Sequence, residues 1–77
     1  MIYKVNDTLQ LNGNTVVSIL GNGKGLKNGV YIENEIGVKY YVISVGIGRM
    51  KNGKFPNFTN LLIDGPFTGE SITVLDE

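Results

Sequence analysis

Glycine and lysine alternate in one segment of the chain, which makes it the first candidate for chemistry. The segment GNGKGLKNG spans residues 21–29. A loop that cradles phosphate needs Gly-Lys followed by Ser or Thr, and a helix must begin directly after it. Here Gly23-Lys24 is followed by another glycine, and Gly29 precedes the strand-like pattern Val30 to Ile32. We therefore predict two successive turns at this place and no bound nucleotide or other cofactor.

Cations and aromatic rings are interleaved in a second segment, GRMKNGKFPNFTN, which covers residues 48–60. Proteins that bind single-stranded nucleic acid use this combination, because the cations follow the phosphates while the rings stack on bases. Two interpretations stay open: the rings stack on bases, or they fold back and plug one end of the domain. Asn52-Gly53 predicts a tight turn within the segment. The candidate binding residues are Arg49, Lys51, Lys54, Phe55 and Phe58, together with Lys24 and Lys27 of the glycine-rich segment.

Two tyrosines form a third candidate surface. The alternation in GVYIEN places Val30 and Ile32 toward the interior and Tyr31 toward solvent. Tyr40 is expected to face outward from an adjacent strand. A pair of exposed tyrosines can act as a protein-binding hot spot or as a stacking platform. Ordinary cross-strand packing is the alternative interpretation.

Enzymatic chemistry has little support in the composition. Histidine and cysteine are absent, which removes the usual general base, the thiolate nucleophile and the commonest metal ligands. The serines therefore have no histidine to activate them. The carboxylates show no spacing typical of an acid–base pair. Glu33 and Glu35 lie on one side of a strand end, where they could contact a divalent ion weakly, but a solvated turn is the favoured interpretation. We predict no enzyme activity, no metal site and no cofactor.

The charge of the chain is balanced overall but unevenly distributed. The 77 residues have a formal net charge of zero. Residues 21–55 carry six basic and two acidic side chains, whereas residues 56–77 carry four acidic ones and no basic one. The apolar runs are far shorter than the roughly 20 residues that cross a bilayer, and the N-terminal segment lacks the features of a signal peptide. We expect one soluble domain over residues 1–77, located in the cytoplasm and without a membrane partner.

Strand and turn signals dominate the rest of the sequence. Alanine is absent while valine, isoleucine, glycine and asparagine are abundant, a mixture that disfavours helices. Asn12-Gly13 predicts a type I′ hairpin turn. The longest strand candidate, VKYYVISVGI, places Tyr41, Ile43, Val45 and Ile47 on one face, and Gly46 and Gly48 suit either a barrel corner or the strand end. About six short strands predict an all-β fold, a small closed or partly open antiparallel β-barrel.

The segment GNTVVSILGNGKGLKNGVYIENEIGVKYYVISVGI resembles the second domain of the translational GTPases, the β-barrel that follows the G domain in elongation factor Tu. The residues that carry the resemblance are Gly13, Val16, Val17, Gly21, Gly25, Leu26, Lys27, Gly29, Val30 to Ile32, Val42 to Val45, Gly69, Ile72 and Val74. The resemblance implies the same barrel and a binding role. Asn28-Gly29-Val30 departs from the family's usual Gly-Asp, and without a G domain no GTP hydrolysis is implied.

Two functions from different classes follow. The first is a non-catalytic module that binds single-stranded nucleic acid, RNA in particular, or the ribosome, with an affinity that falls steeply with salt. The second is a protein-binding or self-associating assembly module that uses an open barrel edge or the face with Tyr31 and Tyr40. Concentration-dependent association would support the homo-oligomeric form of the second.

Overall fold

The computed structural model describes residues 2–21, 23–48 and 58–75, and most of these residues lie in β-strands. Within the described residues there are six strands and no helix, and hence no helix that could cross a membrane. The all-β prediction is therefore confirmed. The strands are β1 (Ile2–Leu11), β2 (Asn14–Leu20), β3 (Tyr31–Asn34), β4 (Lys39–Gly48), β5 (Phe58–Ile63) and β6 (Ser71–Leu75).

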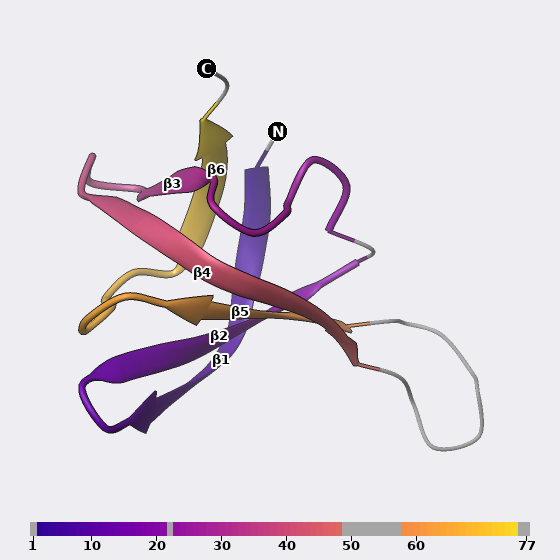
Figure 1. Ribbon diagram of the computed structural model, residues 1–77. Coiled ribbons are helices and arrows are strands. Elements are labelled where there is room, and N and C mark those ends of the chain that lie inside the picture. The colour runs from indigo at the N-terminus through magenta and orange to yellow at the C-terminus, as the bar shows by residue number, and fades with distance from the viewer. Residues whose placement is uncertain (1, 22, 49–57, 76–77) are drawn as a thin grey trace.

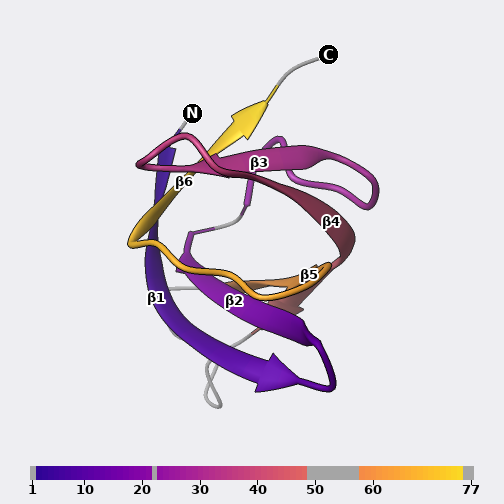
Figure 2. The same ribbon diagram turned by 90° about the vertical axis from the view of Figure 1, so that its left-hand side faces the viewer.

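The strands close into an antiparallel barrel in the order β1-β2-β5-β4-β3-β6 (Figures 1 and 2). Closure depends on the two long strands β1 and β4, each of which pairs with one strand along its first part and with another along the rest. β1 pairs with β6 through Ile2–Lys4 and with β2 from Val5 onward. β4 pairs with β3 up to Tyr41 and with β5 from Val42 onward. Of the two predicted forms, closed and partly open, the described strands adopt the closed one.

The hairpin between β1 and β2 has the turn that the sequence predicts. Asn12 and Gly13 both have positive φ, 44° and 88°, as a type I′ turn requires. β1 begins at Ile2 and bends where its register with β2 shifts between Val5 and Asp7. The extra residue of a bulge allows one strand to follow two sheets.

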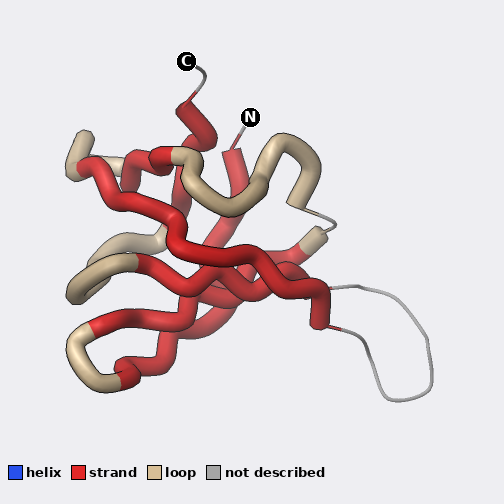
Figure 3. The backbone as a smooth tube through the Cα atoms, in the orientation of Figure 1, coloured by secondary structure: helices blue, strands red, loops and turns tan. Residues whose placement is uncertain are grey.

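The glycine-rich loop between β2 and β3 consists of turns, as predicted. The amide of Leu26 donates to the carbonyl of Gly23 at 2.9 Å, and the amide of Val30 donates to the carbonyl of Lys27 at 3.4 Å. These are two successive turns, and β3 begins directly after them. Gly23 is required for packing as well as for its φ of 65°, because a Cβ there would lie 2.7 Å from Cγ2 of Thr59. Figure 3 shows this loop in tan at the top of the barrel.

The core is formed by the inward-facing side chains of five strands. Two buried threonines extend it: Thr15 donates to the carbonyl of Gly65 at 3.0 Å, and Thr59 donates to that of Gly21 at 2.8 Å. Both bonds attach a loop to a strand while satisfying a buried hydroxyl. The fully buried aliphatic residues are Val17, Ile19, Ile32, Val42, Leu61, Ile63 and Ile72.

The predicted faces of β4 need one correction. Val42 pairs with Ile63 and Ser44 pairs with Leu62, so Ile43 is an extra, bulged residue. The bulge shifts the alternation, and Val42 and Val45 therefore both pack on the core. The prediction that Ile43 and Val45 share one face is wrong. The irregularity in the strand also lies at Ile43 and not at the glycines proposed for a corner.

One end of the barrel is closed by a side-chain cluster, which we call the plugged end: Asn34, Tyr40, Phe67 and Thr68. Phe67 comes from the loop between β5 and β6 and is 7% exposed, with its ring 4.6 Å from that of Tyr40. Asn34 donates through Nδ2 to the carbonyl of Thr68 at 2.7 Å and accepts at Oδ1 from the amides of Ile36 and Val38. The cluster thus joins this loop to the turn between β3 and β4.

Candidate functional site

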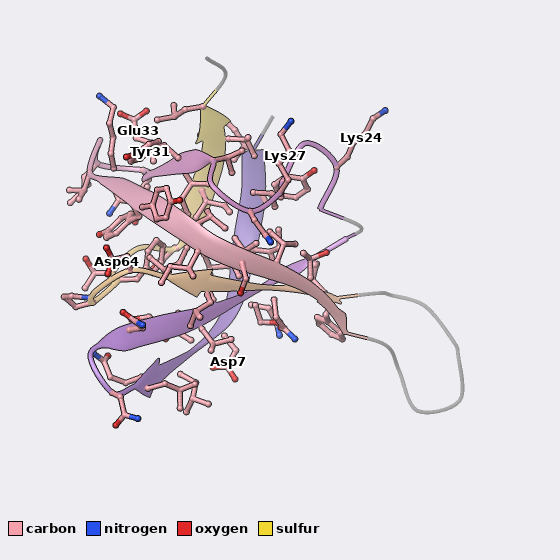
Figure 4. The ribbon with its side chains drawn as sticks, in the orientation of Figure 1. Asp7, Lys24, Lys27, Tyr31, Glu33 and Asp64 are labelled. Carbon is pink, nitrogen blue, oxygen red and sulfur yellow. The ribbon has the colours of Figure 1, made fainter. Side chains whose placement is uncertain are left out.

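The predicted cationic residues are only partly covered by the described structure. Lys24 and Lys27 lie on the glycine-rich loop with exposed side chains (Figure 4). The carbonyl of Lys24 accepts a hydrogen bond from the hydroxyl of Tyr3 at 2.6 Å, which attaches this loop to β1. Arg49, Lys51, Lys54 and Phe55, with the predicted turn at Asn52-Gly53, lie outside the described residues.

Phe58 is the one ring of the cation-rich segment that the structure places. It is the first residue of β5, is half-buried, and pairs with Leu20 on the outer side of the barrel. It therefore does not plug the barrel end. The ring that does so is Phe67, in the loop between β5 and β6, which is not among the candidate residues predicted from the sequence. A proline before Phe67 and a glycine two residues after it hid this role, since both are loop signals.

The tyrosine pair exists, but one partner differs from the prediction. Tyr31 on β3 pairs with Tyr41 on β4, with ring centroids 5.3 Å apart and an interplanar angle of 64°. Their side chains are 47% and 40% exposed. Tyr40 was predicted to face outward, and this is wrong: it is half-buried and packs against the core. Because Tyr40 and the buried Val42 are two residues apart, they share the inner face of the strand.

A hollow of about 740 Å³ lies beside this pair, between the glycine-rich loop and the end of β6. Asn28 accepts from the amide of Val45 at 2.9 Å, and the amide of Gly29 donates to the carbonyl of Val42 at 2.8 Å. These bonds hold the loop against β4 and so fix one wall of the hollow. The lining residues are Gly25, Lys27, Asn28, Gly29, Val30, Tyr31, Val74 and Leu75. We call Lys27, Tyr31, Tyr41 and Leu75 the tyrosine surface.

A second apolar surface covers the outer side of β1, β2 and β5. Directly paired residues point to the same side of a sheet, so the register defines rows that run across these strands. Two apolar rows flank one polar row, and a shallow hollow of about 360 Å³ lies among them. We call this surface the leucine face: Leu9, Val16 and Leu62 in one row, Asp7, Ser18 and Asn60 in the next, and Leu20 and Phe58 in the third.

Glu35 has a structural contact that the sequence did not reveal. Its Oε1 accepts from the amides of Glu70 at 2.9 Å and Ser71 at 3.1 Å. Hydrogen bonds from backbone amides, first its own and then those of Glu70 and Ser71, lower the pKa of Glu35 below its usual 4.5. The carboxylate thus fastens the turn after β3 to the start of β6. Among the described residues, no three Asp or Glu side chains are grouped to hold a metal ion.

These features describe a small closed β-barrel with two apolar outer surfaces and a hydrogen-bonded plug at one end. Comparisons with models of protein families, with curated proteins and with solved structures find no match. The resemblance to the second domain of the translational GTPases therefore rests on the sequence residues alone. The geometry of the two outer surfaces is the remaining guide to function.

Proposed function

We propose that this protein is a non-catalytic interaction module that binds a segment of another protein at the tyrosine surface. One observation carries the proposal: Tyr31 and Tyr41 form an edge-to-face pair that is exposed over nearly half of its surface and lies next to a hollow lined by Lys27. Tyrosine is enriched at binding hot spots, because its ring supplies apolar area and its hydroxyl supplies a hydrogen bond.

The lining of the hollow indicates the chemistry of the partner. Lys27 is the charged side chain among the residues that line it, and Val30, Val74 and Leu75 supply apolar surface. A segment with a carboxylate next to one or two apolar side chains complements this arrangement. Because Tyr31 pairs with Tyr41 on one side and with Leu75 on the other, β3 has no open edge here, and the partner contacts a face of the sheet.

A protein partner is favoured over single-stranded RNA at the tyrosine surface, because Lys27 is the one cation among the described residues that line the hollow. The chain as a whole carries seven basic and seven acidic side chains and has no net attraction for a polyanion. Binding that is driven by counterion release needs several cations aligned along the phosphates. A role related to the translational GTPase domain and a location in the cytoplasm belong to the proposal and rest on the sequence.

Peptide selection tests the proposal directly. Peptides selected on the immobilised protein from a random displayed library are expected to share an acidic residue next to an aromatic or aliphatic one. Fluorescence anisotropy should then show that Tyr31→Ala and Lys27→Ala each weaken binding of a selected peptide, Tyr31→Ala by about 30-fold, as for a hot-spot tyrosine. Lys4→Ala is the matched control, since Lys4 lies on β1 outside the hollow.

Two outcomes contradict the proposal. Selected peptides whose affinity is unchanged by Tyr31→Ala would show that binding occurs elsewhere. Labelled oligouridine that binds more tightly than any selected peptide at 150 mM salt would identify nucleic acid as the partner class.

A further inference from the structure

The leucine face has an ordered alternation of apolar and polar rows. Leu9, Val16 and Leu62 follow one another across β1, β2 and β5. Next to them lies the polar row of Asp7, Ser18 and Asn60, and beyond it the apolar Leu20 and Phe58. Leu9 is 60% exposed and Leu20 is 42% exposed. Apolar side chains gathered in rows on a sheet mark an interaction surface more strongly than the same side chains scattered singly.

A partner at this face meets the flat of the sheet and not the edge of β1. Beyond Lys4, β1 pairs with β2 alone among the described strands, so its other side resembles an edge. However, Oδ1 of Asp7 accepts from the amide of Thr8 at 2.9 Å. The bulge between Val5 and Asp7 also bends the strand. A side chain that occupies an edge amide and a bulge that twists the edge both oppose strand addition.

We propose that the leucine face binds the leucine face of a second copy of this protein, about a two-fold axis parallel to β2. In this arrangement Val16 and Ser18 lie on the axis and contact their own counterparts. Leu9 lies against Leu62 of the second copy, because rotation about the axis exchanges β1 and β5. Strands of the two sheets run in nearly the same direction, as in aligned sheet packing.

The polar row selects both the partner and the axis. Asp7 is the charged residue in the three rows, and the axis along β2 places its carboxylate against the amide of Asn60 of the second copy. Asn60 can donate to the carboxylate from its NH₂ group. An axis across the strands would instead place Asp7 against Asp7 of the second copy, and two desolvated carboxylates repel. The face is therefore complementary to itself in only one of the two orientations.

The size of the face agrees with a reversible dimer. Three or four strands about 4.8 Å apart and three rows about 7 Å apart give roughly 300–400 Å² per copy. The buried total of about 600–800 Å² is that of a weak, transient interface. We therefore expect association at micromolar to millimolar protein concentrations. This dimer surface is separate from the tyrosine surface, so either proposal can fail without the other.

Sedimentation equilibrium of the full chain tests whether the face associates. The wild type should shift from monomer to dimer between about 1 µM and 1 mM, and Leu9→Asp should weaken the dimer at least tenfold. Ile36→Asp is the matched control, because Ile36 is 75% exposed but lies on the turn between β3 and β4. A wild type that stays monomeric up to 1 mM overturns the proposal. Equal weakening by both variants overturns the assignment to this face.

Exchanging two side chains of the polar row tests the axis. Asn60→Asp places a carboxylate against Asp7 of the second copy and should weaken the dimer at least tenfold. The double variant Asp7→Asn with Asn60→Asp restores a carboxylate–amide pair and should return to within about threefold of the wild type. Asp7→Asn keeps the Oδ1 acceptor for the Thr8 amide, so the fold of β1 is preserved. With an axis across the strands, Asp7→Asn alone would remove a repulsion between two carboxylates and strengthen the dimer. Strengthening by this single variant, or absence of rescue in the double variant, overturns the proposed axis.

Cross-linking supplies a second measurement that does not depend on affinity. The chain has no cysteine, so a single introduced thiol reacts alone. Val16→Cys should cross-link to a dimer with a short bis-maleimide, since Val16 lies on the axis. Leu9→Cys should cross-link only when mixed with Leu62→Cys. Efficient cross-linking of Leu9→Cys to itself would contradict the axis along β2. A monomer in which the Leu9→Cys thiol is nevertheless protected from maleimide would show that another part of the same chain covers the face.

Discussion

The plugged end and the leucine face use similar residue types in opposite ways. At the plugged end, Asn34 makes hydrogen bonds to Ile36, Val38 and Thr68, and Phe67 is almost fully buried. On the leucine face, Asn60 is exposed and Phe58 is only half-buried. An asparagine and a phenylalanine occur in both regions, so their surroundings decide what each residue contributes.

This difference separates residues that hold the fold from residues that are free to bind. Most large losses of stability come from cavities in the core or from buried polar groups that lose their partners. Phe67 is a buried core side chain, and Asn34 is a buried polar side chain with hydrogen-bond partners, whereas Leu9 and Asn60 are exposed. Substitutions at the plugged end should therefore change stability, whereas substitutions on the leucine face should change association.

Phe67→Ala is expected to have the largest effect. Removing a buried phenylalanine side chain costs about 3–4 kcal/mol, because apolar contacts are lost and a cavity is left. A domain of this size has a total stability of about 4–8 kcal/mol, so the variant should be close to unfolding at room temperature. Urea denaturation followed by circular dichroism measures the loss. Phe67→Leu, which retains part of the packing, should lose about 1 kcal/mol. A loss below 1 kcal/mol for Phe67→Ala would show that the ring does not support the barrel.

Asn34→Ala should cost about 2–3 kcal/mol, since it removes a buried side chain that accepts from two amides and donates to a carbonyl. Asn60→Ala is the matched control and should change stability by less than about 0.5 kcal/mol, because its side chain is exposed. Both are read from the same urea unfolding curves at low protein concentration. Equal losses at the two asparagines would contradict the contrast between the two regions.

Local signals were sufficient for the sequence to predict the barrel. Asn12-Gly13 can hardly adopt anything other than a hairpin turn, and the glycines before Val30 can hardly continue into a helix. The number of strands followed from such turns. The plugged end could not be predicted in the same way, because Asn34 and Thr68 are 34 residues apart and meet only after the barrel has closed.

The candidate surfaces were predictable only in part. Tyr31 was placed outside correctly, because strict alternation around the buried Ile32 fixes its direction. The exposure of Tyr41 was not predicted, because the bulge at Ile43 interrupts the alternation of inward and outward side chains along β4. An unbroken alternation carried from one side of the bulge to the other assigns the wrong face. The leucine face was missed because its rows depend on register between strands. Leu9, Val16 and Leu62 are distant in sequence and form a row only through pairing.

Glu35 should make the stability of the fold depend on pH. The pKa of Glu35 is lower in the folded protein than its usual 4.5, because backbone amides donate to the carboxylate. The folded state therefore binds a proton less readily than the unfolded state, so the contribution is present above pH 4.5 and is lost as the pH falls below it. Glu35→Gln should be less stable than the wild type at pH 7, and the difference should shrink toward pH 3. Asp64→Asn, which removes an exposed carboxylate from the loop between β5 and β6, is the control. A difference that grows as the pH falls would contradict this assignment.

Leu9→Asp should have the smallest effect on the stability of the fold but should still weaken the association of two copies. Leu9 is 60% exposed, so at a concentration where the wild type is monomeric the variant should unfold within about 0.5 kcal/mol of it. At higher concentration the two should diverge, because a dimer that forms only from folded chains raises the midpoint of unfolding with protein concentration. Thermal unfolding at about 5 µM and at about 500 µM measures both effects. These concentrations span the association that we expect for an interface of this size. The wild-type midpoint should rise between these concentrations and that of Leu9→Asp should stay constant. A midpoint that already falls by several degrees in dilute Leu9→Asp would place Leu9 with the structural residues and remove the distinction between the two regions.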